Sequence, residues 1–566
     1  MSNQNGTTDK KSRAAWASFS GNRSLILSHI QRGLLIFSYM MIAIFGYIAL
    51  SSYFVIIMEM VGKIDQLYLY PYDWPDTIFF TRLVSEGLFF TNPVSGFIAS
   101  GSMAGLFPPL FHVFAFLVNL AFNNMNLTLV FISISLSFAL AYLILKDWHD
   151  WRLRVLLFCF IFLPPFQYGL FPFPSRLRVL LALLFLVLMF KNPLKMDRVK
   201  CFLLFGTLIV LSQPLIAIMG IAAYFFIDSA DKKFRLERRM LAPLALLVAI
   251  FVSVYSGHLY YKFLSPPASN GGFEVVACSI EAMYIIFSFT PWMFLFYCIV
   301  VPFFLLFLPS RDLKILFLIF IATIAFGGLL RVFPSLLIKV LSIFGEDLCM
   351  PLSPYIAFFA IFPPGRGAIP GKLVSTFVVA SLAVMMFLQA SVLYHYDIGY
   401  KLRKTYEELA LSFQPHTTVL SMRLFFLEDT KKVYFESFDF RLMSIMYLAG
   451  MPNTFYYSPM QQFYDTENLL PAVKKFVDSL SSTNASECSD AADFLGNRTD
   501  YLHISPSFPN MHNYSWSYNQ SKRLANKSFL NSCGVDLILP NQAYFENSKS
   551  NESYLQYVFH FRKQAG

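Results

Sequence analysis

Long apolar runs alternate with short polar segments along the first two-thirds of the chain. The run Gly33–Met58 meets no charged residue until Glu59 and exceeds the roughly 20 apolar residues that a helix needs to cross a bilayer core. Nine further runs have the same character: Leu106–Phe122, Leu127–Leu145, Val155–Phe171, Leu177–Phe190, Cys201–Ile227, Leu241–Tyr260, Ile280–Leu308, Leu313–Leu330 and Val374–Leu393. Two shorter runs, Ser335–Phe344 and Pro351–Phe362, are candidates to span, re-enter or lie at the interface. The pattern predicts a polytopic α-helical membrane protein with about 10–13 transmembrane helices.

Composition argues against the alternative, in which these runs are buried helices of a large soluble protein. The chain is 56% apolar, 18% aromatic and only 14% charged, which departs from the average of soluble proteins. Ten apolar runs with short connections leave too little polar chain to cover them. We therefore expect an integral, multi-pass membrane protein whose partners include membrane lipids.

The polar segments divide the chain into three regions. Residues 1–32 are polar and basic, and the apolar run after them is too long for the core of a cleavable signal peptide, which predicts a cytoplasmic N-terminal tail and an uncleaved signal anchor. Residues 33–393 form the transmembrane domain. Its first external loop, residues 59–105, contains a predicted amphipathic helix over Thr77–Phe90 lying on the membrane surface.

From about residue 394 the sequence becomes polar and rich in turn-forming residues. Its apolar stretches shorten to the length of strands or short helices, as in Thr418–Leu424 and Val535–Leu539. Residues 394–566 are therefore predicted to form a soluble α/β or α+β domain outside the cytoplasm.

The net charge of +10 does not indicate nucleic-acid binding, because the cations flank the predicted spans, as in 191–200 and 232–239. Positively charged loops remain on the cytoplasmic side of a membrane. This rule places the N-terminus in the cytoplasm and the first loop outside.

Acceptor sequences for N-glycosylation gather in the last part of the chain, which favours exposure outside the cytoplasm. They lie at Asn484, Asn497, Asn513, Asn519, Asn526 and Asn551. Lys401, Arg403 and Lys404 by themselves favour a cytoplasmic domain, but large domains cross the membrane largely regardless of charge. Cys488 and Cys533 are the two cysteines of this domain and are candidates for a disulfide, although their spacing alone does not establish pairing.

The first external loop carries the clearest chemical signal. It contains Asp73 and Asp76, followed by Arg82, and the Pro-Pro-Leu-Phe-His segment ending at His112 opens the next apolar run. Transfer of a sugar from a lipid phosphate requires a base for the acceptor or a metal ion for the phosphate. A carboxylate can serve as either.

This order of features resembles the GT-C glycosyltransferases, which use polyprenyl or dolichyl phosphate sugars as donors. Asp76-x-x-Phe79-x-x-Arg82 is similar to a stretch in the first loop of oligosaccharyltransferase catalytic subunits. The resemblance implies that Asp76 is the catalytic or metal-binding carboxylate, with Asp73 as its neighbour or substitute. It also implies a lipid-linked sugar donor, a lipid, glycan or protein acceptor, and either no cofactor or a divalent cation such as Mg²⁺ or Mn²⁺.

One departure from that family narrows the activity. The Trp-Trp-Asp-Tyr-Gly signature of oligosaccharyltransferases is absent, and residues 394–399 keep only its Asp and Gly at shifted spacing. We therefore expect transfer of a single sugar rather than of a whole oligosaccharide. The expected location is the cell membrane of a prokaryote or the endoplasmic reticulum membrane, with the active face outside the cytoplasm.

Several residues admit both a functional and a structural interpretation. Asp76 is also suited to cap the helix beginning near Thr77. Arg82 is a candidate to bind the donor phosphate or to pair with Glu86 one helical turn later. His112 is a candidate to contact acceptor or phosphate, or to be a satisfied core residue.

Further candidates lie outside the first loop. Arg331, at the end of an apolar run, is predicted to bind the lipid phosphate or to anchor the helix at the interface. Arg176 and Arg178 have the same two interpretations. Glu274 and Glu281 are candidates for a second acid or metal ligand.

Two other function classes fit the hydropathy pattern. A secondary transporter or a lipid flippase or scramblase also has this number of spans, although no repeat of one half in the other is visible. An oligosaccharyltransferase-like enzyme or a GT-C-shaped protein without catalysis is the second alternative. The sequence contains no phosphate-binding loop, nucleophile elbow or His-Glu-x-x-His motif.

Overall fold

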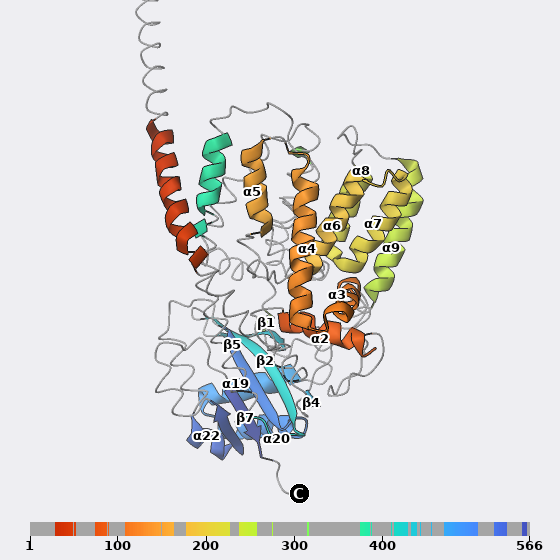
Figure 1. Ribbon diagram of the computed structural model, residues 1–566. Helices are drawn as coiled ribbons and strands as arrows, with labels where there is room; N and C mark the ends of the chain where they lie inside the picture. The colour runs from red at the N-terminus through yellow and green to blue at the C-terminus, as the bar shows by residue number, and fades with distance from the viewer. Residues whose placement is uncertain are drawn as a thin grey trace, which may run out of the picture.

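The computed structural model is mostly helical, with one mixed β-sheet toward the C-terminus (Figure 1). It describes residues 29–48, 50–51, 74–87, 89, 108–148, 150–162, 177–226, 237–256, 274–275, 314–315, 374–384, 386–387, 409, 412–427, 432–438, 442, 446, 454–455, 469–507, 526–539 and 557–562. The helices of the first part are His29–Ile48, α2 (Trp74–Ser85), α3 (Leu110–Phe122), α4 (Met125–Leu145), α5 (Trp151–Phe162), α6 (Leu177–Lys191), α7 (Arg198–Ser212), α8 (Pro214–Phe226), the short 3-10 helix η1 (Arg238–Met240), α9 (Leu241–Val254) and Val374–Val384.

The directions of α4 and α6 follow from contacts at their ends. Lys191, the last residue of α6, forms an ion pair with Asp147 at 2.6 Å and donates to the backbone carbonyl of Leu143 near the end of α4. The two helices also pack against each other, so they run in the same direction with their C-terminal ends together.

Basic residues from separate loops meet at this C-terminal end of α4 and α6, called here the basic end. Arg198 at the start of α7 pairs with Glu237 at 2.6 Å, and Arg239 pairs with the other oxygen of Glu237 at 2.7 Å. The hydrogen bond from Arg239, together with the charges of Arg198 and Arg239, lowers the pKa of Glu237. The two arginines thus favour the ionised form of Glu237. Exposed cations without an ion pair among the described residues also lie in these segments: Lys146, Lys195, Lys200 and Arg238.

The prediction that Leu106–Phe122 forms the second span is wrong. Helix α3 covers 13 residues, fewer than the roughly 20 that a bilayer core requires. Its first turn lies beside α2 and near Arg178 at the start of α6, and only Asn123 and Asn124 separate its end from the start of α4. Both ends of α3 therefore lie at the end of the bundle opposite the basic end, and α3 does not cross the bundle.

The prediction of one continuous helix over Cys201–Ile227 is also wrong. Pro214 has no amide hydrogen and disfavours helical geometry at the preceding residue, so Gln213 is extended, with φ −159° and ψ 119°. Arg198, at the start of α7, donates to the carbonyl of Tyr224, near the end of α8, at 2.9 Å, so the two helices are antiparallel. Their turn is buried, with Ser212 fully covered and Gln213 7% exposed.

The helices His29–Ile48 and Val374–Val384 lie side by side at one edge of the molecule (Figure 1). Gln31 donates to Thr376 at 2.8 Å, and the rings of Phe45 and Phe387 lie 5.0 Å apart, so the two segments run in parallel. Arg152 at the start of α5 donates to Ser375 at 2.7 Å, which brings the start of the second helix to the basic end.

By length and composition, two described helices suffice to cross a membrane, His29–Ile48 and Met125–Leu145. The first exposes most of its large apolar side chains, including Tyr47 at 74%. The run Leu177–Phe190 is found as α6. The runs Leu241–Tyr260 and Val374–Leu393 contain α9 and the helix Val374–Val384, and the run Val155–Phe171 overlaps α5, which begins earlier, at Trp151. The runs Ile280–Leu308, Leu313–Leu330, Ser335–Phe344 and Pro351–Phe362 lie outside the described residues apart from 314–315.

A second buried core, separate from that of the helical bundle, extends from Leu409 to Phe561. Its strands are β2 (Thr418–Leu427), β3 (Lys432–Phe438), β4 (Thr454–Phe455), β5 (Tyr501–Ser507), β6 (Val535–Leu539) and β7 (Tyr557–Phe561). Its helices are α19 (Leu469–Ser482), α20 (Ala485–Gly496) and α22 (Lys527–Ser532).

The sheet is mixed, with strand order β1-β3-β2-β5-β7-β6, in which β1 is Glu274–Val275; β4 pairs with β2. The parallel pair β2 and β5 at its centre is connected through α19 and α20, and antiparallel neighbours flank it. Phe476 of α19 packs edge-on against Phe559 of β7 at 5.3 Å. The prediction of a C-terminal region with strands and short helices is confirmed, and β6 has the predicted bounds.

Candidate functional site

The contact between α2 and α3 brings together two parts of the first loop. Thr81 Oγ1 lies 3.4 Å from His112 Nδ1. Helix α2 begins at Trp74 and ends at Ser85, after which Gly87 takes φ +71°, a conformation that favours glycine. Its apolar side is buried by protein, with Phe79 and Leu83 fully covered, so the expected helix forms but packs into the bundle core instead of lying only on a membrane surface.

His112 lies in a shell of aromatic side chains. Its ring centroid is 5.3 Å from that of Phe80, 6.0 Å from Phe89 and 5.6 Å from Phe111. The residue is 1% exposed. Within the part of the chain that the structure describes, its Nε2 atom has no hydrogen-bond partner. One ring nitrogen of His112, Nδ1, thus has a hydrogen-bond partner and the other, Nε2, has none among the described residues. This differs from a fully satisfied core histidine and, in this structure, also from a histidine that contacts acceptor or phosphate.

Arg178, the second residue of α6, adds a cation to this junction. Burial, and secondarily the charge of Arg178, lower the pKa of His112 well below its usual value. The imidazole is therefore neutral near pH 7. We call Thr81, His112 and Arg178, with the three phenylalanine rings, the α2–α3–α6 junction.

Asp76 is the third residue of α2, and its helical backbone is described. The expectation that it caps a helix beginning near Thr77 is therefore wrong, because the helix starts three residues earlier. A carboxylate in the first turn is favoured by the positive end of the helix dipole. Asp76 also precedes Phe80, a neighbour of His112, by one turn, which places the two residues on one face of α2.

Arg82 forms the ion pair with Glu86 that was the structural interpretation of this residue. Its Nε donates to Glu86 at 2.8 Å, and the two side chains are 43% and 34% exposed. Such exposed ion pairs contribute about 0–1 kcal/mol to folding stability, so a phosphate could compete with Glu86 for Arg82 at little cost. Phosphate binding by Arg82 therefore stays a prediction.

Asp73, Glu281 and Arg331 lie outside the described residues. Glu274 lies on β1 (Glu274–Val275), which pairs in parallel with β3 through the register Glu274↔Tyr434. Two residues of the loop 261–279, Glu274 and Val275, thereby form the edge strand of the C-terminal sheet. Among the described residues, no group of three His, Cys, Asp or Glu is arranged to hold a metal ion.

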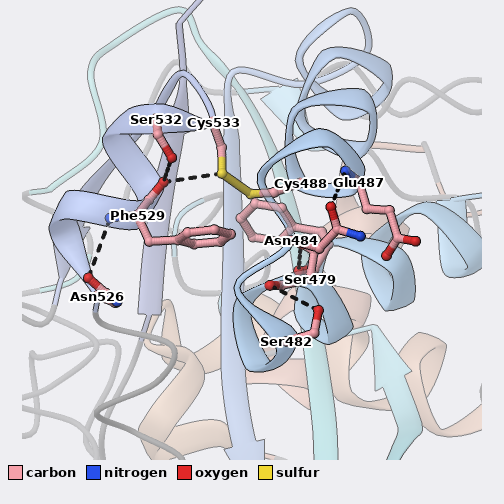
Figure 2. The surroundings of a disulfide bond; sticks show 10 residues. Ser479, Ser482, Asn484, Glu487, Cys488, Asn526, Phe529, Ser532 and Cys533 are labelled. Carbon is pink, nitrogen blue, oxygen red and sulfur yellow. Dashed lines mark hydrogen bonds between the residues drawn. A yellow bond between two sulfur atoms is a disulfide. The ribbon is translucent and has the colours of Figure 1, made fainter.

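A disulfide joins Cys488 in α20 to Cys533 at the end of α22, with the two Cα atoms 5.6 Å apart (Figure 2). Asn484 and Asn526, each in an acceptor sequence, are the N-caps of these same helices. Their side-chain oxygens accept from the backbone amides of Glu487 and Phe529, both at 3.4 Å.

The described acceptor asparagines, Asn484, Asn497 and Asn526, are all exposed. Thr499, the hydroxyl residue of the Asn497 sequence, is buried, and its Oγ1 lies 2.9 Å from the carbonyl oxygens of both Thr418 and Tyr501, which share its one hydrogen. Asn513, Asn519 and Asn551 lie outside the described residues.

Sequence reasoning missed Thr81 as a site residue. Its one available signal is the spacing from Thr77, which places both on one face of a helix that also carries Asp76 and Arg82. No protein-family model matches the chain, and no curated protein matches it in sequence.

Proposed function

We propose that this protein is a multi-pass membrane glycosyltransferase of the GT-C type. It moves one sugar from a polyprenyl or dolichyl phosphate to a lipid, glycan or protein acceptor on the extracytoplasmic side. The observation that carries the proposal is the chemical difference between the two ends of the helical bundle.

The basic end fits the cytoplasmic side of a membrane. Lys191 and Arg198 flank the connection between α6 and α7, Arg239 lies in η1, and all three are found there together with exposed cations. The α2–α3–α6 junction lies at the opposite end, where a lipid-linked donor with its sugar outside the cytoplasm is within reach.

The C-terminal domain supports the same orientation. A disulfide between Cys488 and Cys533 is a feature of proteins in oxidising compartments, and exposed acceptor asparagines suit the same compartments. In Figure 1 the sheet lies on the α2 side of the bundle, away from the basic end. The domain is therefore suited to help select the acceptor.

In this proposal Asp76 supplies the carboxylate of the site, as base or metal ligand, and Arg178 and Arg331 are the candidate ligands of the lipid phosphate. A resident Mg²⁺ or Mn²⁺ would require further oxygen ligands beyond those in the described residues.

The test is a sugar-transfer assay in membranes with labelled dolichyl- or polyprenyl-phosphate sugars, comparing the wild type with Asp76→Asn. Removing a catalytic carboxylate lowers the rate by about a hundredfold or more. Asp490→Asn is the matched control and should leave activity unchanged, because Asp490 is an exposed acid of α20 whose one ion pair among the described residues is with Lys475, at 3.2 Å.

Two outcomes would overturn the proposal. Full activity of a folded Asp76→Asn protein would remove the assigned role of the first loop. Substrate flux in proteoliposomes without any lipid-sugar donor, combined with no transfer by the wild type, would favour the transporter or scramblase alternative.

A further inference from the structure

The hydrogen bonds of Thr81 determine which nitrogen of His112 carries the proton. A threonine hydroxyl has one hydrogen to donate. In α2 this hydrogen goes to the backbone carbonyl of Thr77, at 2.8 Å. Toward His112 Nδ1 the Thr81 oxygen can therefore only accept, and Nδ1 is the nitrogen that donates.

The neutral imidazole then has a lone pair on Nε2. That atom is buried among phenylalanine rings and has no partner within the described part of the chain. A buried acceptor without a donor costs about 1–3 kcal/mol, and such atoms are rare enough in native proteins to call for an explanation. The unpaired Nε2 is explained if a substrate group donates a hydrogen bond to this atom during the reaction.

We propose that His112 Nε2 accepts the proton of the acceptor hydroxyl and that Thr81 is its positioning residue. The inference rests on the proposed function and narrows its acceptor to a hydroxyl-bearing glycan, lipid or side chain. The acceptor oxygen forms the new bond to the anomeric carbon of the sugar. The bond from that carbon to the lipid phosphate oxygen breaks with its electron pair, and the hydroxyl proton passes to Nε2.

This assignment changes the role that the sequence predicted for His112. A neutral Nε2 acceptor has no hydrogen to offer a phosphate oxygen, which is itself an acceptor. Arg178 at the same junction is the better phosphate ligand, because a guanidinium donates several hydrogen bonds and carries a permanent charge.

Access to Nε2 requires one ring of the shell to move. Phe80 and Phe111 lie within helices α2 and α3, whereas Phe89 follows the turn at Gly87 and is held by a backbone bond to Leu83 at 3.1 Å. Displacing Phe89 disrupts no helix. It is therefore the ring that an incoming acceptor displaces.

The pH profile of this site depends on few neighbouring charges. The described charged residues at this end of the helices that contact α3 are Asp76 and Arg82 on α2, Glu86 just after α2, and Arg178 on α6. Helix α4 has no charged residue, and those of α7, Arg198 and Lys200, lie at the basic end.

The experiment uses the full-length protein in membranes, a labelled lipid-phosphate sugar and a hydroxyl acceptor. His112→Asn keeps a donor near the Nδ1 position, facing Thr81, and removes the group at Nε2. We expect at least about a hundredfold loss in rate, the typical contribution of a general base, with an unchanged melting temperature. If the residue is only structural, this variant keeps its activity.

Thr81→Val and Thr81→Ser test the positioning role without changing the histidine. Losing the acceptor at Nδ1 disfavours the imidazolium, so Thr81→Val should slow transfer by about tenfold to a hundredfold, as loss of a residue that orients a histidine does. Thr81→Val should also shift the acid limb of the pH profile of the transfer rate to lower pH. Thr81→Ser should restore both the rate and the position of this limb.

Each result decides one question. A folded His112→Asn protein that keeps its activity overturns this inference but leaves the proposed function intact. A Thr81→Val protein whose pH profile is unshifted has the same two consequences. If His112→Asn does not fold, the Thr81 pair decides alone. A wild type that transfers no sugar overturns the proposed function and this inference together.

Discussion

At the scale of single residues, two glycines let helices of the bundle approach closely. A Cβ atom built on Gly220 in α8 would lie 2.4 Å from Leu186 Cδ1 in α6, and one on Gly206 in α7 would lie 2.6 Å from Leu247 Cδ1 in α9. These contacts hold together the helices that carry Arg178 and the buried turn at Gln213.

Substituting Gly220→Val should destabilise the bundle by about 1–3 kcal/mol, because the added methyl groups overpack against Leu186. Leu186→Ala in the same chain makes room and should recover part of the loss. Thermal unfolding in detergent measures both variants. Gly46→Val, at a position with nothing within 4 Å, is the control, and an equal loss there would contradict the packing explanation.

At the same scale, Asn484 caps α20 and is a predicted glycan acceptor, and three variants separate the two roles. Asn484→Asp keeps a capping oxygen, Ser486→Ala keeps Asn484 itself, and each abolishes the acceptor sequence. Both should lose one glycan in a mobility shift while unfolding like an enzymatically deglycosylated wild type. Asn484→Gln should lose the same glycan and about 1 kcal/mol in addition, because the cap is lost. Equal stability of Asn484→Gln and Asn484→Asp would contradict the capping role.

At the scale of elements, the hydropathy pattern predicted correctly the helices and strands whose apolar runs have polar residues at both ends. Helices α4 and α6 begin and end within a few residues of their apolar runs, and β6 matches Val535–Leu539. The errors at α3 and at α7–α8 have a common cause. Hydropathy averages over a window, so it does not register a single proline such as Pro214 or the two asparagines between α3 and α4.

The α2–α3–α6 junction was predictable only in part. Asp76, Arg82 and His112 stood out in the sequence because of their residue types and their position after the first span. The contact of Thr81 with His112 joins residues 31 positions apart, and Arg178 comes from a third helix. Such proximity depends on how the helices pack, which one-dimensional periodicity does not encode.

At the scale of the whole molecule, the proposed orientation predicts which side of the membrane each end of the bundle faces. Leu194 is 67% exposed in the loop between α6 and α7 at the basic end. Leu194→Cys should react with a membrane-impermeant maleimide only after cells are permeabilised, since a cytoplasmic thiol is otherwise out of reach. The parent chain controls for native cysteines.

In sealed, right-side-out membranes prepared from the same cells, an externally added glycosidase should remove the glycans of the C-terminal domain, and an externally added protease should cleave this domain. For an endoplasmic reticulum protein the corresponding preparation is an opened microsome. Labelling of Leu194→Cys from the same side as the glycans would contradict the proposed orientation.

The proline after Gln213 also bears on the proposed topology. Because Pro214 interrupts the run Cys201–Ile227, α7 and α8 return the chain to the end of the bundle at which α7 begins. In the proposed orientation, a variant that joined α7 and α8 into one straight helix is expected to deliver the later segments, including the C-terminal domain, to the opposite side of the membrane.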